Sequence, residues 1–98
     1  MIEYIALAGI SDALRDKMID NLGYDSVLNL ACNYELVKNN ISLFRQLGIE
    51  DIDNLLLNKD YVFLKDTREI FNKFTNFNLN EIINLINNDY DAIDVVFM

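Results

Sequence analysis

The sequence predicts an all-α fold, a small bundle or irregular stack of five to seven short helices. Three observations support this prediction. Apolar residues recur at three- and four-residue spacings along the 98-residue chain, which is the pattern of amphipathic helices. Proline is absent and there are three glycines, so helices have to end at these glycines or at Asn and Asp. Short Asn- and Asp-rich stretches do separate the apolar segments. From its length, the chain is expected to form a single domain, residues 1–98.

The chain begins with a short apolar segment, residues 2–7, that ends near Gly9. This segment has neither the basic leader nor the long apolar stretch of a secretory signal, so we expect it to belong to the mature domain and the protein to be cytoplasmic. No run approaches the roughly 18 uninterrupted apolar residues that a membrane helix needs. We therefore expect no membrane contact.

A helix is predicted from Ser11 or Asp12 to about Leu22, because either residue can act as its N-cap. Gly23 follows in the position where a left-handed backbone commonly ends a helix. The apolar residues on one face of this helix are Leu14, Met18 and Leu22.

Asp25 is the next predicted N-cap, opening a short helix that ends before Asn33. A longer helix is expected from about Glu35 to Leu47, and Gly48 ends it. The residues at helical spacings in this longer helix are Leu36, Val37, Ile41, Phe44 and Leu47.

A short helix is predicted from Glu50 to about Leu57, ending at Asn58. The next segment, Tyr61 to Leu64, is rich in β-favouring residues and fits either a buried helical turn or a short strand. Two pairs with capping-box spacing then mark the starts of two further helices. These pairs are Asp66 with Glu69 and Asn78 with Glu81. The apolar C-terminus is expected to pack against the core, with Val95 to Met98 as either a helix or a strand.

Pieces of the sequence recur at uneven spacings of about 25 to 30 residues, a period found in helical repeat arrays. Aligning Gly23 with Gly48 matches LGYDSVLNLACN to LGIEDIDNLLLN, and Phe44 then falls on Phe71 after a two-residue insertion. A third copy, NLNEIINLINNDYDAI, matches best where residues 58–61 align with 87–90. The chain is therefore either a set of repeated helical hairpins or an Asn-rich bundle with chance matches.

Residues 47–74 contain a leucine–glycine start, a short helix ending in paired leucines, a turn, an apolar dyad and a second helix. The residues that form this pattern are Leu47, Gly48, Ile52, Leu55, Leu56, Val62, Phe63, Leu64 and Phe71. The pattern resembles the helical repeats of the mitochondrial transcription termination factor family. That resemblance implies stacked helical hairpins, and nucleic-acid binding on a basic concave face. This chain has Lys59 and Asp60 in the turn where the family normally has a proline.

Residues 9–31, GISDALRDKMIDNLGYDSVLNLA, resemble a helix-hairpin-helix element of DNA-processing proteins. In that element a glycine-rich hairpin presents backbone N–H groups to a phosphate. The element has two closely spaced glycines, whereas this chain has Gly9 followed by Ser11 and Asp12. Nucleic-acid binding is accordingly the alternative function.

Eight basic and sixteen acidic residues give a net charge of −8, which opposes nucleic-acid binding because phosphate binders need a basic surface. Arg15, Lys38 and Arg45 would have to converge on one face for that function. The acidic excess is uneven, since no Lys or Arg occurs from Thr75 to Met98. The predicted partner-binding residues in this acidic region are Asp89, Asp91 and Asp94.

Three aromatic residues stand three positions apart, at Phe71, Phe74 and Phe77. We predict a core stripe, with a groove or a nucleic-acid stacking platform as the alternative. Any exposed part of this stripe is expected to be a protein-binding patch.

The chain has no histidine, the commonest general base and metal ligand at neutral pH. The acidic runs at residues 50–53 and 89–91 lack an EF-hand pattern and are predicted to be solvated carboxylates near helix starts. Cys32, the single cysteine, is predicted to be buried and inert. We expect no enzyme activity, metal or cofactor. The predicted function is a non-catalytic protein-interaction or regulatory module that binds a protein partner or self-associates.

Overall fold

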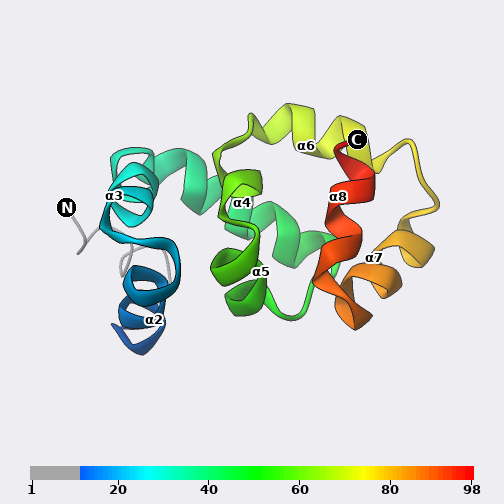
Figure 1. Ribbon diagram of the computed structural model, residues 1–98. Coiled ribbons are helices and arrows are strands. Elements are labelled where there is room, and N and C mark those ends of the chain that lie inside the picture. The colour runs from blue at the N-terminus through cyan, green and yellow to red at the C-terminus, as the bar shows by residue number, and fades with distance from the viewer. Residues whose placement is uncertain (1–11) are drawn as a thin grey trace.

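The computed structural model describes residues 12–98 and confirms the predicted all-α class (Figure 1). Within these residues there are seven α-helices, two 3-10 helices and no strand. In chain order they are α2 (Asp12–Leu22), α3 (Tyr24–Cys32), α4 (Tyr34–Leu47), α5 (Ile52–Asn58), η1 (Asp60–Leu64), α6 (Thr67–Phe74), α7 (Leu79–Asn88), η2 (Tyr90–Ala92) and α8 (Ile93–Val96). The apolar segment predicted at residues 2–7 lies outside the described residues.

Glycines and polar caps set most helix boundaries, as predicted. Gly23 and Gly48 follow α2 and α4 with positive φ angles of 87° and 106°, a conformation that favours glycine because a Cβ is strained there. The side chains of Asp51, Asp66 and Asn78 each accept a hydrogen bond from a backbone N–H in the first turn of α5, α6 and α7. The predicted caps Asp66 and Asn78 are therefore confirmed, whereas α5, predicted to start at Glu50, starts after Asp51.

Two predictions about α3 are wrong. Gly23, rather than Asp25, is the N-cap, and Asp25 lies inside the first turn, where its negative charge suits the positive end of the helix dipole. Cys32 is exposed instead of buried. The buried face of α3 consists of Val27, Leu30 and Ala31, and at about 100° per residue Cys32 points away from that face.

The two segments left open between helix and strand are both helical. Tyr61 to Leu64 belongs to the 3-10 helix η1, in which Val62 and Phe63 are fully buried. Their β-favouring character reflects burial rather than strand formation. Val95 and Val96 are the last residues of α8, and Phe97 and Met98 follow it without forming a strand.

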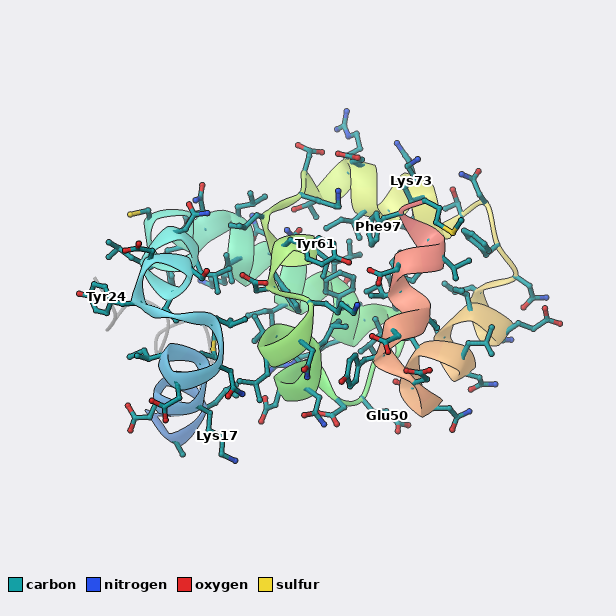
Figure 2. All side chains as sticks on the ribbon, in the orientation of Figure 1. Lys17, Tyr24, Glu50, Tyr61, Lys73 and Phe97 are labelled. Atoms are coloured by element: carbon teal, nitrogen blue, oxygen red, sulfur yellow. The ribbon has the colours of Figure 1, made fainter. Side chains whose placement is uncertain are left out.

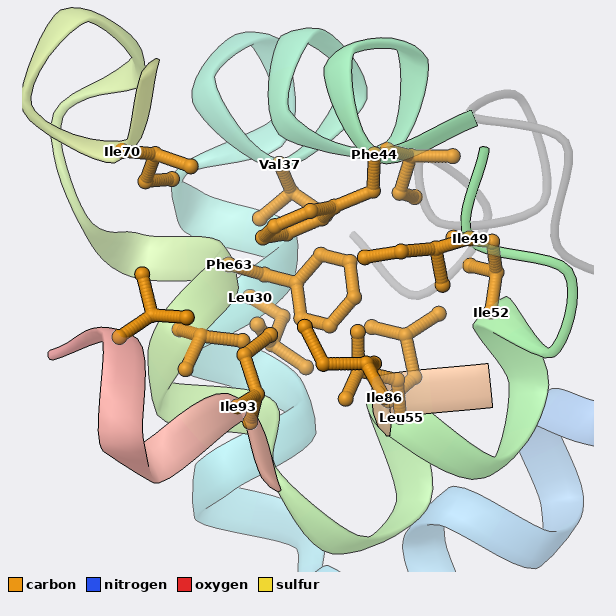
Figure 3. Close-up of a cluster of buried hydrophobic side chains, with 14 of the residues drawn as sticks. Leu30, Val37, Phe44, Ile49, Ile52, Leu55, Phe63, Ile70, Ile86 and Ile93 are labelled. Atoms are coloured by element: carbon orange, nitrogen blue, oxygen red, sulfur yellow. The ribbon is translucent and has the colours of Figure 1, made fainter. Parts of the chain in front are cut away.

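The core lies where α4, η1 and α6 meet, and α7 and α8 close it (Figure 3). The ring of Phe44 on α4 packs edge-on against Phe63 of η1 at a centroid distance of 5.1 Å and against Phe74 of α6 at 6.1 Å. The C-terminal segment packs against the core, as predicted, through the buried residues Ile93 and Val96, whereas Val95 and Met98 are exposed. Helices α2 and α3 form the other end of the molecule, with α2 against α5 (Figure 1).

One buried polar side chain, Asn40 of α4, joins this core to the chain that connects η1 and α6. Its amide nitrogen donates to the carbonyl oxygens of Phe63 at 2.7 Å and Lys65 at 2.8 Å. Its amide oxygen accepts from the Thr67 hydroxyl at 2.6 Å. The whole side-chain amide is therefore hydrogen-bonded, as a buried polar group requires.

Two successive units of similar build make up residues 34–96. Unit A consists of α4, α5 and η1, and unit B consists of α6, α7 and η2 with α8. In each unit, one residue separates the second helix from the 3-10 helix. These residues, Lys59 and Asp89, stand 30 positions apart. Each donates its backbone N–H to the carbonyl four residues earlier, at 2.7 and 2.9 Å. The units therefore match at a spacing of 30 residues.

Four pairs of core residues follow the same spacing. The buried counterparts in the two units are Phe44 and Phe74, Ile52 and Ile82, Leu56 and Ile86, and Phe63 and Ile93. The sequence alignment paired Phe44 with Phe71, whereas the structure pairs it with Phe74. The spacing of 30 residues between units A and B therefore differs from the register of the sequence alignment, and the hairpin repeat stays a prediction.

Candidate functional site

The structure brings two of the three predicted partner-binding residues together on Lys59. The Nζ atom of Lys59 lies 3.1 Å from Oδ1 of Asp91 and 2.7 Å from Oδ2 of Asp94. The Tyr61 hydroxyl, which lies between η1 and α8 (Figure 2), donates to the other oxygen of Asp94. Asp89 instead caps η2, accepting from the backbone N–H of Asp91 at 3.0 Å.

This cluster, Lys59 with Tyr61, Asp91 and Asp94, attaches the C-terminal segment to the end of α5. The hydrogen bonds from Lys59 to Asp94 and then to Asp91 raise the pKa of Lys59 above its ordinary value of 10.5. The Lys59 side chain is only 16% exposed, whereas that of Asp91 is 65% exposed. Asp91 can therefore contact a partner without leaving the cluster. The pairing of Lys59 with Asp94 could not be predicted from the sequence because 35 residues separate them.

We expect Lys59→Met to lower the free energy of unfolding at neutral pH, because Asp91 and Asp94 would lose the cation between them. The folded-state pKa of Lys59 is raised, so its contribution is fully present below about pH 10.5 and is lost as pH rises through the folded-state pKa. Urea unfolding of both proteins from neutral pH to about pH 12 measures this difference.

Lys17→Met, at an exposed lysine of α2, controls for the loss of one positive charge. The difference between wild type and Lys59→Met should be constant near neutral pH and should shrink above pH 10.5. A difference that stayed constant into the alkaline range would show that the ion pair does not stabilise the C-terminal segment.

The second feature is an apolar cleft between the end of α4, α6 and the start of α7. It has a volume of about 300 Å³ and is lined by Leu47, Phe71, Phe74, Thr75, Phe77 and Leu79. Phe71 and Leu79 are 49% and 42% exposed, whereas Phe74 is 1% exposed and forms the floor. The predicted aromatic stripe therefore divides, with Phe74 in the core and Phe71 and Phe77 at the cleft.

The lining of the cleft is uncharged. Of the described residues, those that line it carry no charge, and Asp89, Asp91 and Asp94 are not among them. Lys73 points away from the core on the outer side of α6, while Phe97 lies beneath α6, with its ring 6.3 Å from that of Phe74 (Figure 2). The aromatic patch and the acidic residues are thus separate features of unit B.

The basic residues that the nucleic-acid alternative requires are only partly described. Lys38 and Arg45 are both exposed on α4 and, seven positions apart, lie on the same side of it. The Lys38 ammonium is 5.8 Å from the centre of the Tyr34 ring. The Arg15 side chain lies outside the described residues, so the convergence of all three stays a prediction.

Within residues 12–98, no three acidic, cysteine or histidine side chains lie close enough together to hold a metal ion. In the same range, no helix has both the length and the apolar character needed to cross a membrane. Comparisons of the chain with protein-family models, with curated proteins and with solved structures give no match.

Proposed function

We propose that this chain is a non-catalytic protein-interaction module, and that its apolar cleft receives an amphipathic helix of a basic protein partner. The observation that supports the proposal is the half-exposed Phe71 ring in a cleft lined almost entirely by apolar side chains. Apolar surface left in water costs about 25 cal/mol per Å², and a partner that covers it recovers this free energy. Aromatic residues in such pockets commonly dominate the binding energy of protein interfaces.

The shape and charge of the surroundings indicate the kind of partner. An apolar groove between helices suits the apolar face of an amphipathic helix. Residues 75–98 also carry an acidic excess, with Glu81, Asp89, Asp91 and Asp94 but no Lys or Arg. Helix α6 adds Arg68, Glu69 and Lys73, so unit B as a whole stays acidic. This field attracts a basic partner and raises its association rate.

A photo-crosslinking residue at position 71 tests the proposal. We expect benzoyl-phenylalanine in place of Phe71 to give a defined adduct with a partner protein in the source cell. The same residue in place of Tyr24, which is 55% exposed on α3, is the matched control and should give no such adduct. Leu79→Asp places a carboxylate in the cleft and should remove the adduct. No adduct at position 71, or equal adducts at both positions, counts against the proposal.

Reversing the charge of Asp91 tests separately whether the acidic residues attract a basic partner. We expect Asp91→Lys to slow association with the crosslinked partner several-fold at low salt, and the effect should fade as salt rises. Asp91 is preferred to Asp94 because Asp91 pairs with Lys59, whereas Asp94 bonds both Lys59 and Tyr61, so reversing Asp94 would disturb the fold more. Surface plasmon resonance at two salt concentrations measures the association rates of wild type and Asp91→Lys. An equal association rate for both proteins at low salt would refute the attraction of a basic partner by the acidic residues.

A further inference from the structure

A second cavity lies between the start of α5 and the end of α7, and none of the described residues lines both it and the apolar cleft. Its volume is about 260 Å³. Sites for drug-sized ligands usually measure about 300–1,000 Å³, so this cavity suits a smaller group, such as a single amino-acid side chain. The apolar part of its lining is Ile49, Leu55 and Ile86, which belong to the buried core (Figure 3).

Hydrogen bonds hold the polar part of the lining in place. The Asn87 side chain donates to the Gly48 carbonyl oxygen at 3.1 Å and accepts from the Glu50 N–H at 2.9 Å, so it joins the end of α7 to the segment before α5. The Asp51 carboxylate accepts from the backbone N–H of Asn54 at 3.1 Å and from its side-chain amide at 2.6 Å. The second bond uses a donor of the Asn54 amide, whose oxygen remains an acceptor. The polar lining is therefore formed before any ligand binds.

Asp51 gives this cavity a negative charge. Among the described residues that line it, Asp51 alone is charged, and each carboxylate oxygen can accept more than the one hydrogen bond it receives from Asn54. Lys17 lines the neighbouring crevice that Asp51 also borders, where Asp53 offsets its charge. The carboxyl end of α7 meets the cavity, and a helix favours a cation there. The amino end of α5 has the opposite preference but is capped by Asp51. The cavity therefore favours a cationic group.

The other polar side chains favour a guanidinium group over an ammonium group. Acceptors stand on both sides of the cavity, the Asp51 carboxylate at α5 and the Asn88 amide oxygen at α7. A guanidinium is planar and carries five N–H donors in a fork, with no acceptor, so it can donate in two directions. Tyr90 also lines the cavity, and a guanidinium stacks on aromatic rings, whereas an ammonium is a compact and strongly hydrated charge.

We infer that this cavity binds a guanidinium group on a short alkyl chain, as in arginine. Asp51 accepts from the guanidinium, and the apolar residues of the lining contact the alkyl chain. Free arginine and the arginine side chain of a peptide share this chemistry. The inference does not depend on the proposed function, because the cleft is lined by other residues.

Titration of the isotope-labelled chain, followed by NMR, tests the inference. The probes are free arginine, acetyl-arginine amide as a model of a peptide side chain, and acetyl-citrulline amide, which has the same shape without the charge. We expect the arginine probes to shift the side-chain amide signals of Asn54 and Asn88, and the citrulline probe to bind about tenfold more weakly, because hydrogen bonds to charged groups are stronger. Tighter binding of acetyl-arginine amide would identify a peptide as the source of the group, and tighter binding of free arginine would identify the small molecule.

A pair of matched variants locates the binding site. Asp51→Asn removes the charge but keeps the helix cap, because Asn and Asp are equally good N-caps, and it should weaken binding of the arginine probes about tenfold. Asp53→Asn removes the same charge from an exposed residue that does not line the cavity and should leave binding little changed. If Asp51→Asn loses the helical circular dichroism of the wild type, Asn88→Ala, at an exposed position of α7, replaces it and should weaken binding several-fold.

Three results would overturn the inference. The first is the absence of any shift of the Asn54 and Asn88 signals with the arginine probes. The second is equal affinity for the arginine and citrulline probes. The third is an equal loss of affinity in Asp51→Asn and Asp53→Asn, which would show that the probes respond to the overall charge of the chain and not to this cavity.

Discussion

Replacing Phe44 with alanine is expected to lower the free energy of unfolding by about 3–5 kcal/mol, the usual cost of removing a buried phenylalanine ring. The Phe44 side chain is fully buried and contacts the rings of Phe63 and Phe74. It therefore holds α4, η1 and α6 together, and the cavity left behind would open between the two units. Since small domains are stable by about 5–15 kcal/mol, this is a large fraction of the total. Urea unfolding followed by far-UV circular dichroism measures it.

Phe71→Ala is the matched control, because it makes the same chemical change at a half-exposed ring. We expect it to cost less than about 1 kcal/mol, as substitutions away from the core usually do, while removing the cleft's main apolar contact. Equal losses for Phe44→Ala and Phe71→Ala would place Phe71 among the residues that hold the fold together, and the interaction proposal would then lose its support.

Helix positions were predictable where the determining contacts are local. Gly48 ends α4, and Asp66 and Asn78 cap α6 and α7, through bonds that span at most a few residues. Both partners of such a hydrogen bond lie within a few residues of each other in the sequence. For α3 the local signals were ambiguous, and the helix starts at Tyr24 instead of after Asp25. Which of its residues face the core depends on the helices packed against it.

The candidate site was less predictable because its contacts join distant parts of the chain. The sequence shows that Asp91 and Asp94 are acidic, but not that Lys59 lies between them from 35 residues away. Likewise, the three-residue spacing of Phe71 and Phe74 shows that they lie close together on the surface of one helix. Which of the two rings is buried depends on where α4 packs. The cleft exists because α4 reaches Phe74 and leaves Phe71 open.

Asn40 is the clearest long-range contact that the sequence did not reveal, and it carries the second large expected effect. Its side chain is fully buried and donates to two backbone carbonyls, those of Phe63 and Lys65. In Asn40→Ala both carbonyls lose their donor, that of Phe63 in a buried and that of Lys65 in a part-buried environment. Each buried group left unsatisfied costs about 1–3 kcal/mol. We therefore expect a loss of about 2–4 kcal/mol, measured by urea unfolding.

Two further variants separate hydrogen bonding from the loss of side-chain volume. Asn39→Ala, at the adjacent exposed position of α4, should change stability by less than about 0.5 kcal/mol. Asn40→Asp keeps the size of the side chain but replaces the donating amide with a carboxylate, which faces the carbonyls of Phe63 and Lys65 as a third acceptor. It should therefore be at least as destabilising as Asn40→Ala, because a buried carboxylate cannot donate to them. If Asn40→Asp were the milder of the two, volume rather than hydrogen bonding would explain the burial of Asn40.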